Sequence, residues 1–390
     1  MPADLAASPT ARPPAARLVE LDSLRGIAAL IVVLHHVWLT LEGLPAWLVW
    51  AVAETPLRPL ATGRQAVVFF FVLSGYVLTR ALARQEAKQP GSVLSWPGWA
   101  HYAVQRALRL GLPVLGALLL SAALQSLTWR APLPEGSPHI VAGAAWATPW
   151  SWPDLLGQAL LLRHGDGFQL NPVLWSLVHE WRIALLLPLA LLLRSRPEWL
   201  LAVALLGAGV ARLAGMPEGQ VSLGGSLPAT FAASAGFLPA FATGAVLALR
   251  PPKRLDRAQA LAAGLAVLVM AMAAHDYGVI AGSALLILLA QRDGPFARSL
   301  RQRGLLWLGK ISFSLYLAHM PVLLALTHAL RDRAEPWQIG ALAVLLSLPV
   351  AALMFRLVER PAHLLARALP PFAAAASSRS SSRTAEARAR

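Results

Sequence analysis

Ten apolar segments separated by polar connections constrain the fold of this 390-residue chain more than any other feature. An α-helix needs about 20 mostly apolar residues to cross the hydrocarbon core of a bilayer, and somewhat shorter spans occur. Because 57% of the residues are hydrophobic and only 14% are charged, the composition also lies outside the range of soluble domains. We predict an all-α polytopic membrane protein, a bundle of about ten transmembrane helices. The segments cover residues 24–41, 64–83, 107–128, 174–193, 197–215, 229–249, 258–274, 277–291, 305–328 and 337–357.

The distribution of Lys and Arg predicts how this bundle is oriented. Cytoplasmic connections of membrane proteins carry the excess of these residues. With the N-terminus inside, the inner segments hold 25 Lys and Arg residues and the outer segments hold 7, while Arg25 and Arg182 lie within spans. Both termini are therefore predicted to be cytoplasmic. We expect disordered tails at 1–20 and 369–390, the second of them basic, on either side of a transmembrane domain at 21–368.

Several functional classes lose support from composition and motifs. The formal net charge is +15, but the basic residues lie in short connections rather than clustered on a soluble face, which argues against nucleic acid as a partner. Cysteine is absent, so the chain has no disulfide, thiolate zinc site or cysteine nucleophile. The sequence contains no Walker loop, dinucleotide fingerprint, HExxH or GxSxG motif. We predict no metal site, and the ionisable residues within the spans remain as candidates for function.

The first apolar segment places a basic residue and an imidazole on one helical face. At about 100° per residue, the eleven steps from Arg25 to His36 bring the two side chains within roughly 20° of each other. The same steps separate them by roughly 16 Å along the axis, which suits a long, partly anionic ligand. Asp22 can cap the start of this helix and neighbour Arg25, whereas His35 points elsewhere. The alternatives are a snorkelling anchor for Arg25 and a hydrogen-bonded bundle residue for His36.

A second group of polar residues enters the fourth apolar segment. Ser176 and Glu180 are four residues apart and share a helical face. A carboxylate at this depth can orient an imidazole, accept its proton or hold a sugar hydroxyl. The alternative is a structural pair of Glu180 with Arg182 or His179.

Two further stretches carry polar residues on apolar helices. Ser312, Tyr316 and His319 occupy positions i, i+4 and i+7 and form one polar stripe, which lines a cavity or joins helices. Ser74 and Gly75 permit close approach of another helix, and packing is the favoured interpretation for this pair.

These stretches, taken in order, carry a resemblance to a known family. They are LDSLRGIAALIVVLHH at 21–36, FFFVLSGY at 69–76, Arg106 and Arg109 ahead of Pro113, WSLVHE at 175–180, ISFSLYLAH at 311–319, and the closing residues Glu359, Arg360 and Pro361. Together they resemble the membrane-bound acyltransferase family 3, whose members O-acylate sugars of lipopolysaccharide, peptidoglycan, exopolysaccharides, Nod factors or macrolides. Gln105 stands where the family has an arginine, and Phe313 where it has a tyrosine, which excludes a hydroxyl role at position 313.

The resemblance implies an O-acyltransferase of the bacterial inner membrane. Such an enzyme moves an acyl group, most simply acetyl, from acyl-CoA to a hydroxyl of a carbohydrate or glycosylated acceptor. Acyl-CoA is then a co-substrate, membrane lipid surrounds the protein, and no cofactor is permanently bound. Two other classes stay open from the residues alone: a proton-coupled transporter, which also places His, Glu and Arg in spans, and a non-catalytic membrane scaffold.

The same reading assigns expected roles to individual residues. His36 is expected to act as general base on the acceptor hydroxyl or to carry the acyl group transiently, with Glu180 orienting the imidazole or the acceptor. Arg25, Arg106 and Arg109 are expected to hold phosphate groups of coenzyme A, because guanidinium forks suit phosphate. Arg25, His36 and Glu180 are expected to face one cavity. The further pocket residues are Asp22, Ser74, Trp175, Ser176, Ser312, Tyr316 and His319.

Overall fold

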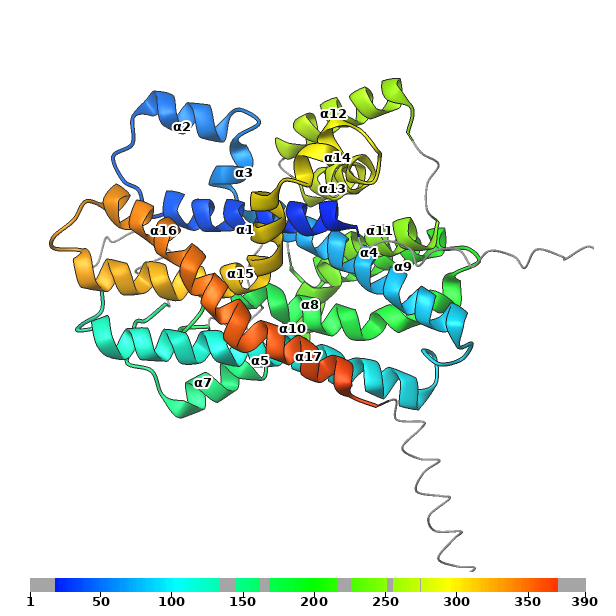
Figure 1. Ribbon diagram of the computed structural model, residues 1–390, viewed down its shortest axis with the longest axis horizontal. Helices are drawn as coiled ribbons and strands as arrows, with labels where there is room; N and C mark the ends of the chain where they lie inside the picture. Colours follow the sequence, from blue (N-terminus) through cyan, green and yellow to red (C-terminus); the bar gives the residue numbers. More distant parts are fainter. Residues whose placement is uncertain are drawn as a thin grey trace, which may run out of the picture.

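The computed structural model is helical throughout the part of the chain that it describes, with no strand in that part (Figure 1). It describes residues 18–133, 145–161, 168–216, 223, 226–250, 255–273 and 275–370. The helices are α1 (Val19–Trp38), α2 (Ala46–Ala53), α3 (Arg58–Ala61), α4 (Arg64–Lys88), α5 (Trp96–Thr128), α7 (Trp152–Ala159), α8 (Leu174–Leu186), the 3₁₀-helix η1 (Leu187–Leu193), α9 (Glu198–Leu213), α10 (Leu227–Gly236), α11 (Leu238–Leu249), α12 (Arg257–Ala271), α13 (Asp276–Ala290), α14 (Pro295–Leu300), α15 (Arg303–Leu330), α16 (Pro336–Met354), the π-helix η2 (Phe355–Glu359) and α17 (Arg360–Ala368).

Six helical segments are long and apolar enough to cross a membrane, which supports a multi-pass membrane protein. The pair α10 and α11 meets the same test with a bend of 42° between its halves, and the apolar helices α12 and α13 have 15 residues each. All ten predicted segments overlap a helix, yet the count of ten spans stays a prediction because several of these helices are short. The six segments are Val19–Trp38, Arg64–Lys88, Trp96–Thr128, Leu174–Leu193, Arg303–Leu330 and Pro336–Ala368.

The first helix begins earlier than the sequence predicted. α1 starts at Val19, inside the predicted tail, and Leu18 stands at its N-cap position without a side-chain hydrogen bond. The prediction that Asp22 caps this helix is therefore wrong, since Asp22 already lies in the first turns. Most of the two predicted tails lies outside the described residues.

Two glycine contacts let the central helices approach at backbone distance. A Cβ atom on Gly26 of α1 would lie 2.5 Å from the Gly309 nitrogen of α15, and a Cβ on Gly75 of α4 would overlap the Phe241 carbonyl of α11. Burial in lipid gains no hydrophobic transfer energy, so helix association depends on such close contacts between small residues. Each contact involves the residue directly after a predicted site residue, because Arg25 precedes Gly26 and Ser74 precedes Gly75. The two helix crossings therefore fix the backbone positions of Arg25 and Ser74.

Candidate active site

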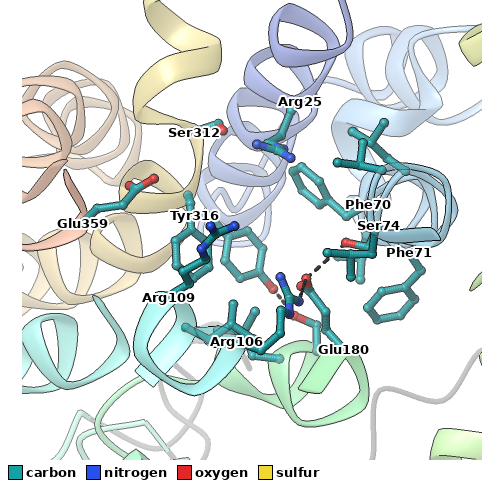
Figure 2. A pocket seen from close by; sticks show the side chains of 18 of the residues that line it. Arg25, Phe70, Phe71, Ser74, Arg106, Arg109, Glu180, Ser312, Tyr316 and Glu359 are labelled. Atoms are coloured by element: carbon teal, nitrogen blue, oxygen red, sulfur yellow. Dashed lines mark hydrogen bonds and ion pairs between the residues drawn. The ribbon is translucent and has the colours of Figure 1, made fainter. Parts of the chain in front are cut away.

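One cavity gathers most of the polar residues that the sequence singled out. Its volume is about 230 Å³, and it is lined by side chains from α1, α4, α5, α8, α15 and the C-terminal helices η2 and α17. Figure 2 shows basic, acidic and hydroxyl groups from these helices pointing into the same space. The predicted site residues among its lining are Arg25, Ser74, Arg106, Arg109, Ser176, Glu180, Ser312 and Tyr316.

Glu180 is held by groups from two other helices. Its Oε1 accepts a hydrogen bond from Arg106 Nη2 at 3.0 Å and another from Ser74 Oγ at 3.1 Å (Figure 2). The side chains of the ion pair are only 11% and 16% exposed, for Arg106 and Glu180 respectively. Removing one partner of such a buried pair leaves an uncompensated charge, which is strongly destabilising. The pair therefore ties α5 to α8 at the cavity wall.

The structural pair that was the alternative for Glu180 does not form. Arg182 donates instead to the Thr230 carbonyl at 3.0 Å and to Ser234 Oγ at 3.2 Å, both on α10. His179 Nδ1 lies 3.0 Å from the same Ser234 hydroxyl. These two residues join α8 to α10 away from the cavity, because they sit on the helical faces that Glu180 does not share.

The three arginines of the predicted donor site differ in their partners. Arg106 is paired with Glu180, whereas Arg25 has only a distant contact, with its Nη1 3.9 Å from Asp22 Oδ1. For Arg109, one helical turn after Arg106, the described residues offer no acidic partner, and its Nε is buried without a hydrogen bond. Arg25 and Arg109 are thus the cations of this cavity that remain available to an anionic ligand.

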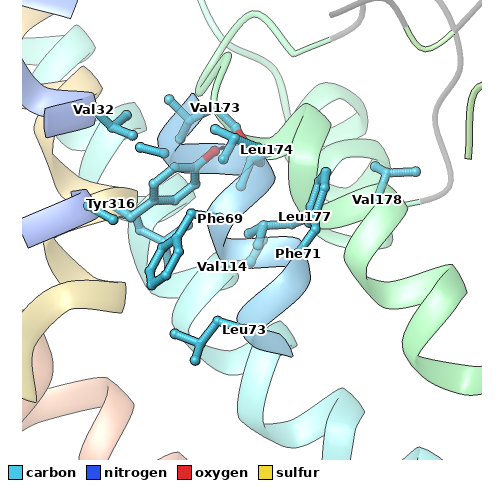
Figure 3. Packing of buried hydrophobic residues seen from close by; sticks show 14 of the residues in the cluster. Val32, Phe69, Phe71, Leu73, Val114, Val173, Leu174, Leu177, Val178 and Tyr316 are labelled. Carbon is cyan, nitrogen blue, oxygen red and sulfur yellow. Dashed lines mark hydrogen bonds between the residues drawn. The ribbon is translucent and has the colours of Figure 1, made fainter. Parts of the chain in front are cut away.

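The predicted polar stripe on α15 divides into two parts. Ser312 and Tyr316 line the cavity, while His319 does not. The Tyr316 hydroxyl lies 3.0 Å from the Val173 carbonyl and 2.6 Å from Ser176 Oγ, which itself lies 3.3 Å from the same carbonyl, so the two hydroxyls share this acceptor. Figure 3 shows Tyr316 among the buried apolar side chains, with its hydroxyl toward Val173. Tyr316 is therefore fixed at the end of the cavity.

His36 and His319 form a hydrogen-bonded pair. His36 Nδ1 lies 3.0 Å from His319 Nε2 and 2.9 Å from the Val32 carbonyl, and His319 Nδ1 lies 3.1 Å from the Leu315 carbonyl. Carbonyl oxygens only accept hydrogen bonds, so the network assigns the proton to Nδ1 of both rings. His319 Nε2 then accepts from His36, and His36 Nε2 keeps its lone pair. That nitrogen has no protein partner among the described residues.

His36 is not among the residues that line the cavity, contrary to the expectation that it shares one cavity with Arg25 and Glu180. Its partner is His319 rather than Glu180, because Arg106 and Ser74 hold the Glu180 carboxylate at the other end. Tyr316 connects the two places, since it lines the cavity and its ring lies 6.1 Å from that of His319.

The remaining predicted residues also lie outside the cavity. Asp22 lies beside Arg25 but does not line the cavity. Trp175 packs against Phe237, with ring centroids 6.1 Å apart. His35 Nδ1 lies 2.7 Å from the Ala61 carbonyl, in keeping with the prediction that it points away from the Arg25 face. No group of three metal-binding side chains occurs in the described ranges.

The sequence did not assign two lining residues to the site, Glu359 and His363. Glu359 is 4% exposed, and its Oε2 accepts from the Ser314 hydroxyl at 2.6 Å and from the Ser314 backbone N–H at 3.1 Å. An ionisable residue next to an apolar span was a signal for Glu359. His363 lies beyond the last predicted span, on the short amphipathic helix α17, for which the sequence predicted no role.

Comparison with known proteins gives one match. A family model described as an acyltransferase domain, that of acyltransferase family 3, matches residues 18–356. No curated protein and no solved structure matches the chain. The matched range covers the helices α1 to α16 and ends before α17.

Proposed function

The chain belongs to acyltransferase family 3, and from that premise we propose that it is a membrane O-acyltransferase that uses acyl-CoA, most simply acetyl-CoA, to acylate a hydroxyl of a carbohydrate or glycosylated acceptor. The family supports a membrane acyltransferase in general. The carbohydrate acceptor is what the resemblance to the family implies, and the arginines of the cavity support the acyl-CoA donor.

The observation that supports acyl-CoA as the donor is the excess of cations among the residues that line the cavity. Of the three lining arginines, only Arg106 has a carboxylate within a close ion pair. Coenzyme A carries a diphosphate and a 3′-phosphate, and guanidinium groups bind phosphate through paired hydrogen bonds. Arg25 and Arg109 are the residues that would hold these groups, while Arg106 positions Glu180.

The acyl group would be transferred near the histidine pair. His36 lies on the Arg25 face of α1, eleven residues or roughly 16 Å further along the axis, and acyl-CoA is long enough to span that distance. His36 Nε2 takes the proton of the acceptor hydroxyl as its oxygen forms a bond to the thioester carbonyl carbon. The C–S bond breaks, and the proton passes to the departing thiolate, which yields the O-acyl product and free coenzyme A. Transient acylation of the same nitrogen is the other route.

The orientation of the chain is also part of this proposal. We place the chain in a bacterial inner membrane, with ten spans and both termini on the cytoplasmic side. Arg25, near the start of α1, then lies on the side where acyl-CoA is available. The acceptor then approaches from the His36 end.

Two measurements test the proposed function together. Surface glycans of host cells with and without the chain are compared by mass spectrometry, and the purified chain in proteoliposomes is assayed for release of free coenzyme A from acetyl-CoA. We expect glycan-bound acetyl groups and acceptor-dependent release only with the chain present. Solute flux that needs no acyl donor and releases no coenzyme A would indicate the transporter instead.

A further inference from the structure

We propose that the C-terminal helix α17 forms part of the donor-binding site, and that its residues His363 and Arg367 bind phosphate groups of acyl-CoA. The inference rests on the proposed function, because it takes acyl-CoA as the donor. It concerns a helix that begins at Arg360, after the range 18–356 that the family model matches.

Small residues and one hydrogen bond hold α17 against α5. Gln105 of α5 donates through Nε2 to the Ala366 carbonyl at 3.0 Å. Ala362 and Ala366 are buried, so the face of α17 that carries them lies close to its neighbours. Gln105 directly precedes Arg106 in the chain, and the contact therefore fixes α17 beside the arginines of the cavity.

This docking brings one further cation, Arg367, and the His363 imidazole to a place that already has cations in excess. His363 lines the cavity together with Arg25 and Arg109. The charges of Arg25, Arg106, Arg109 and Arg367 all act on His363, and the charge of Arg367 acts on Arg109. Basic groups from α1, α5 and α17 thus converge from three directions.

The carboxylates of the cavity do not balance these charges. Only Glu180 and Glu359 are acidic among the lining residues. Glu180 is paired with Arg106 and Ser74, and Glu359 accepts from both polar groups of Ser314 and interacts electrostatically with Arg25. In Figure 2, Glu359 and Glu180 lie on opposite sides of the space into which Arg109 points.

Unpaired like charges in one place repel each other, and a bound polyanion relieves that repulsion. The buried Nε atom of Arg109, which has no partner among the described residues, is a second sign that a ligand is expected here. A ligand with several phosphate groups can contact α1, α5 and α17 at once, whereas a neutral sugar gains nothing from this charge.

The test measures binding of coenzyme A, and of dephospho-coenzyme A, to the full-length chain in lipid nanodiscs. We expect His363→Ala to raise the Kd for coenzyme A about tenfold, as for the loss of one charge-assisted hydrogen bond. Arg367→Ala removes an exposed charge, so about threefold is expected, with the difference shrinking as salt is added. Arg84→Ala is the matched control, because Arg84 is an exposed arginine of α4 that lies more than one helical turn from any lining residue of that helix, whereas Arg367 is one turn from His363.

A variant that keeps its affinity shows that substitution at position 363 does not by itself unfold the chain. His363→Arg supplies a permanent charge and is expected to bind coenzyme A at least as tightly as the native chain. Dephospho-coenzyme A lacks the 3′-phosphate, so a rise in Kd for coenzyme A alone places α17 at that phosphate. An equal rise in Kd for both ligands places α17 at the diphosphate, and either result supports the proposal. Native-like Kd values for both alanine variants overturn the role of α17 alone. A native chain that binds neither ligand overturns the proposed donor, and this inference with it.

Discussion

The two ends of the α1 face that carries Arg25 differ in the charge of the groups around them. The cavity end contains charged groups, because three arginines line it against two carboxylates. The histidine end contains no charged partner for His36 among the described residues, only His319 and a backbone carbonyl. Charge deep in a membrane protein is costly unless it is paired or faces a cavity. The comparison indicates that the cavity end determines the affinity for the anionic donor through charge. The histidine end determines the rate of acyl transfer through hydrogen-bond geometry.

The largest effect is expected at the histidine end. His36→Ala removes the nitrogen that accepts the proton, and general base catalysis contributes about 10²- to 10⁴-fold to rate. We expect the rate of coenzyme A release with acceptor to fall by that factor at unchanged coenzyme A binding. His35→Ala is the control, since His35 is the adjacent histidine and contacts the Ala61 carbonyl instead. Near-native transfer by His36→Ala would refute the assigned role.

The next largest effect concerns stability and belongs to the cavity end. Glu180→Leu leaves the Arg106 charge buried without its partner, which costs about 3 kcal/mol in comparable pairs. Thermal unfolding in nanodiscs, followed by intrinsic tryptophan fluorescence, measures the loss. The double variant Glu180→Leu with Arg106→Met replaces the pair by apolar groups and is expected to recover most of that stability. A double variant as unstable as the single one would contradict the ion-pair account.

The contrast also separates what the sequence can predict from what it cannot. Helical spacing is local, so it could predict that Ser312 and Tyr316 share one helical face, and both line the cavity together with Arg25. The contact of Gly75 with α11 also agrees with the packing interpretation of that stretch. Each of these statements needs only one helix and its period.

Partners across helices were beyond the same reasoning. Which residue meets Glu180 or His36 depends on how α5, α8 and α15 are placed against α1, and that is decided by backbone contacts such as Gly26 with Gly309. Sequence spacing carries no information on such crossings. Local spacing offered Arg182 or His179 as the structural alternative for Glu180, whereas the structure supplies Arg106 from α5, 74 residues earlier in the chain.

A third prediction probes the hydrogen bond within the histidine pair. His319→Leu removes one of the two acceptors of His36 Nδ1–H and leaves only the Val32 carbonyl to orient the imidazole, a loss of about 2 kcal/mol or roughly 30-fold in kcat. His319→Gln keeps an acceptor oxygen at a similar position and is expected to retain much of the activity. KM for acyl-CoA should stay near its native value in both variants. Equal losses from leucine and glutamine would mean that His319 acts by bulk rather than by hydrogen bonding.

The smallest effect returns to the cavity end and completes the contrast. Arg25→Lys keeps the positive charge but loses the fork that binds two phosphate oxygens at once, so we expect KM for acyl-CoA to rise about fivefold, equivalent to about 1 kcal/mol. Arg25 contacts no group of the histidine pair, and kcat should therefore change little. Thermal stability should also stay native, because the Asp22 contact at 3.9 Å is loose and partly exposed. A fall in kcat at constant KM would reverse the assignment of affinity and chemistry to the two ends of α1.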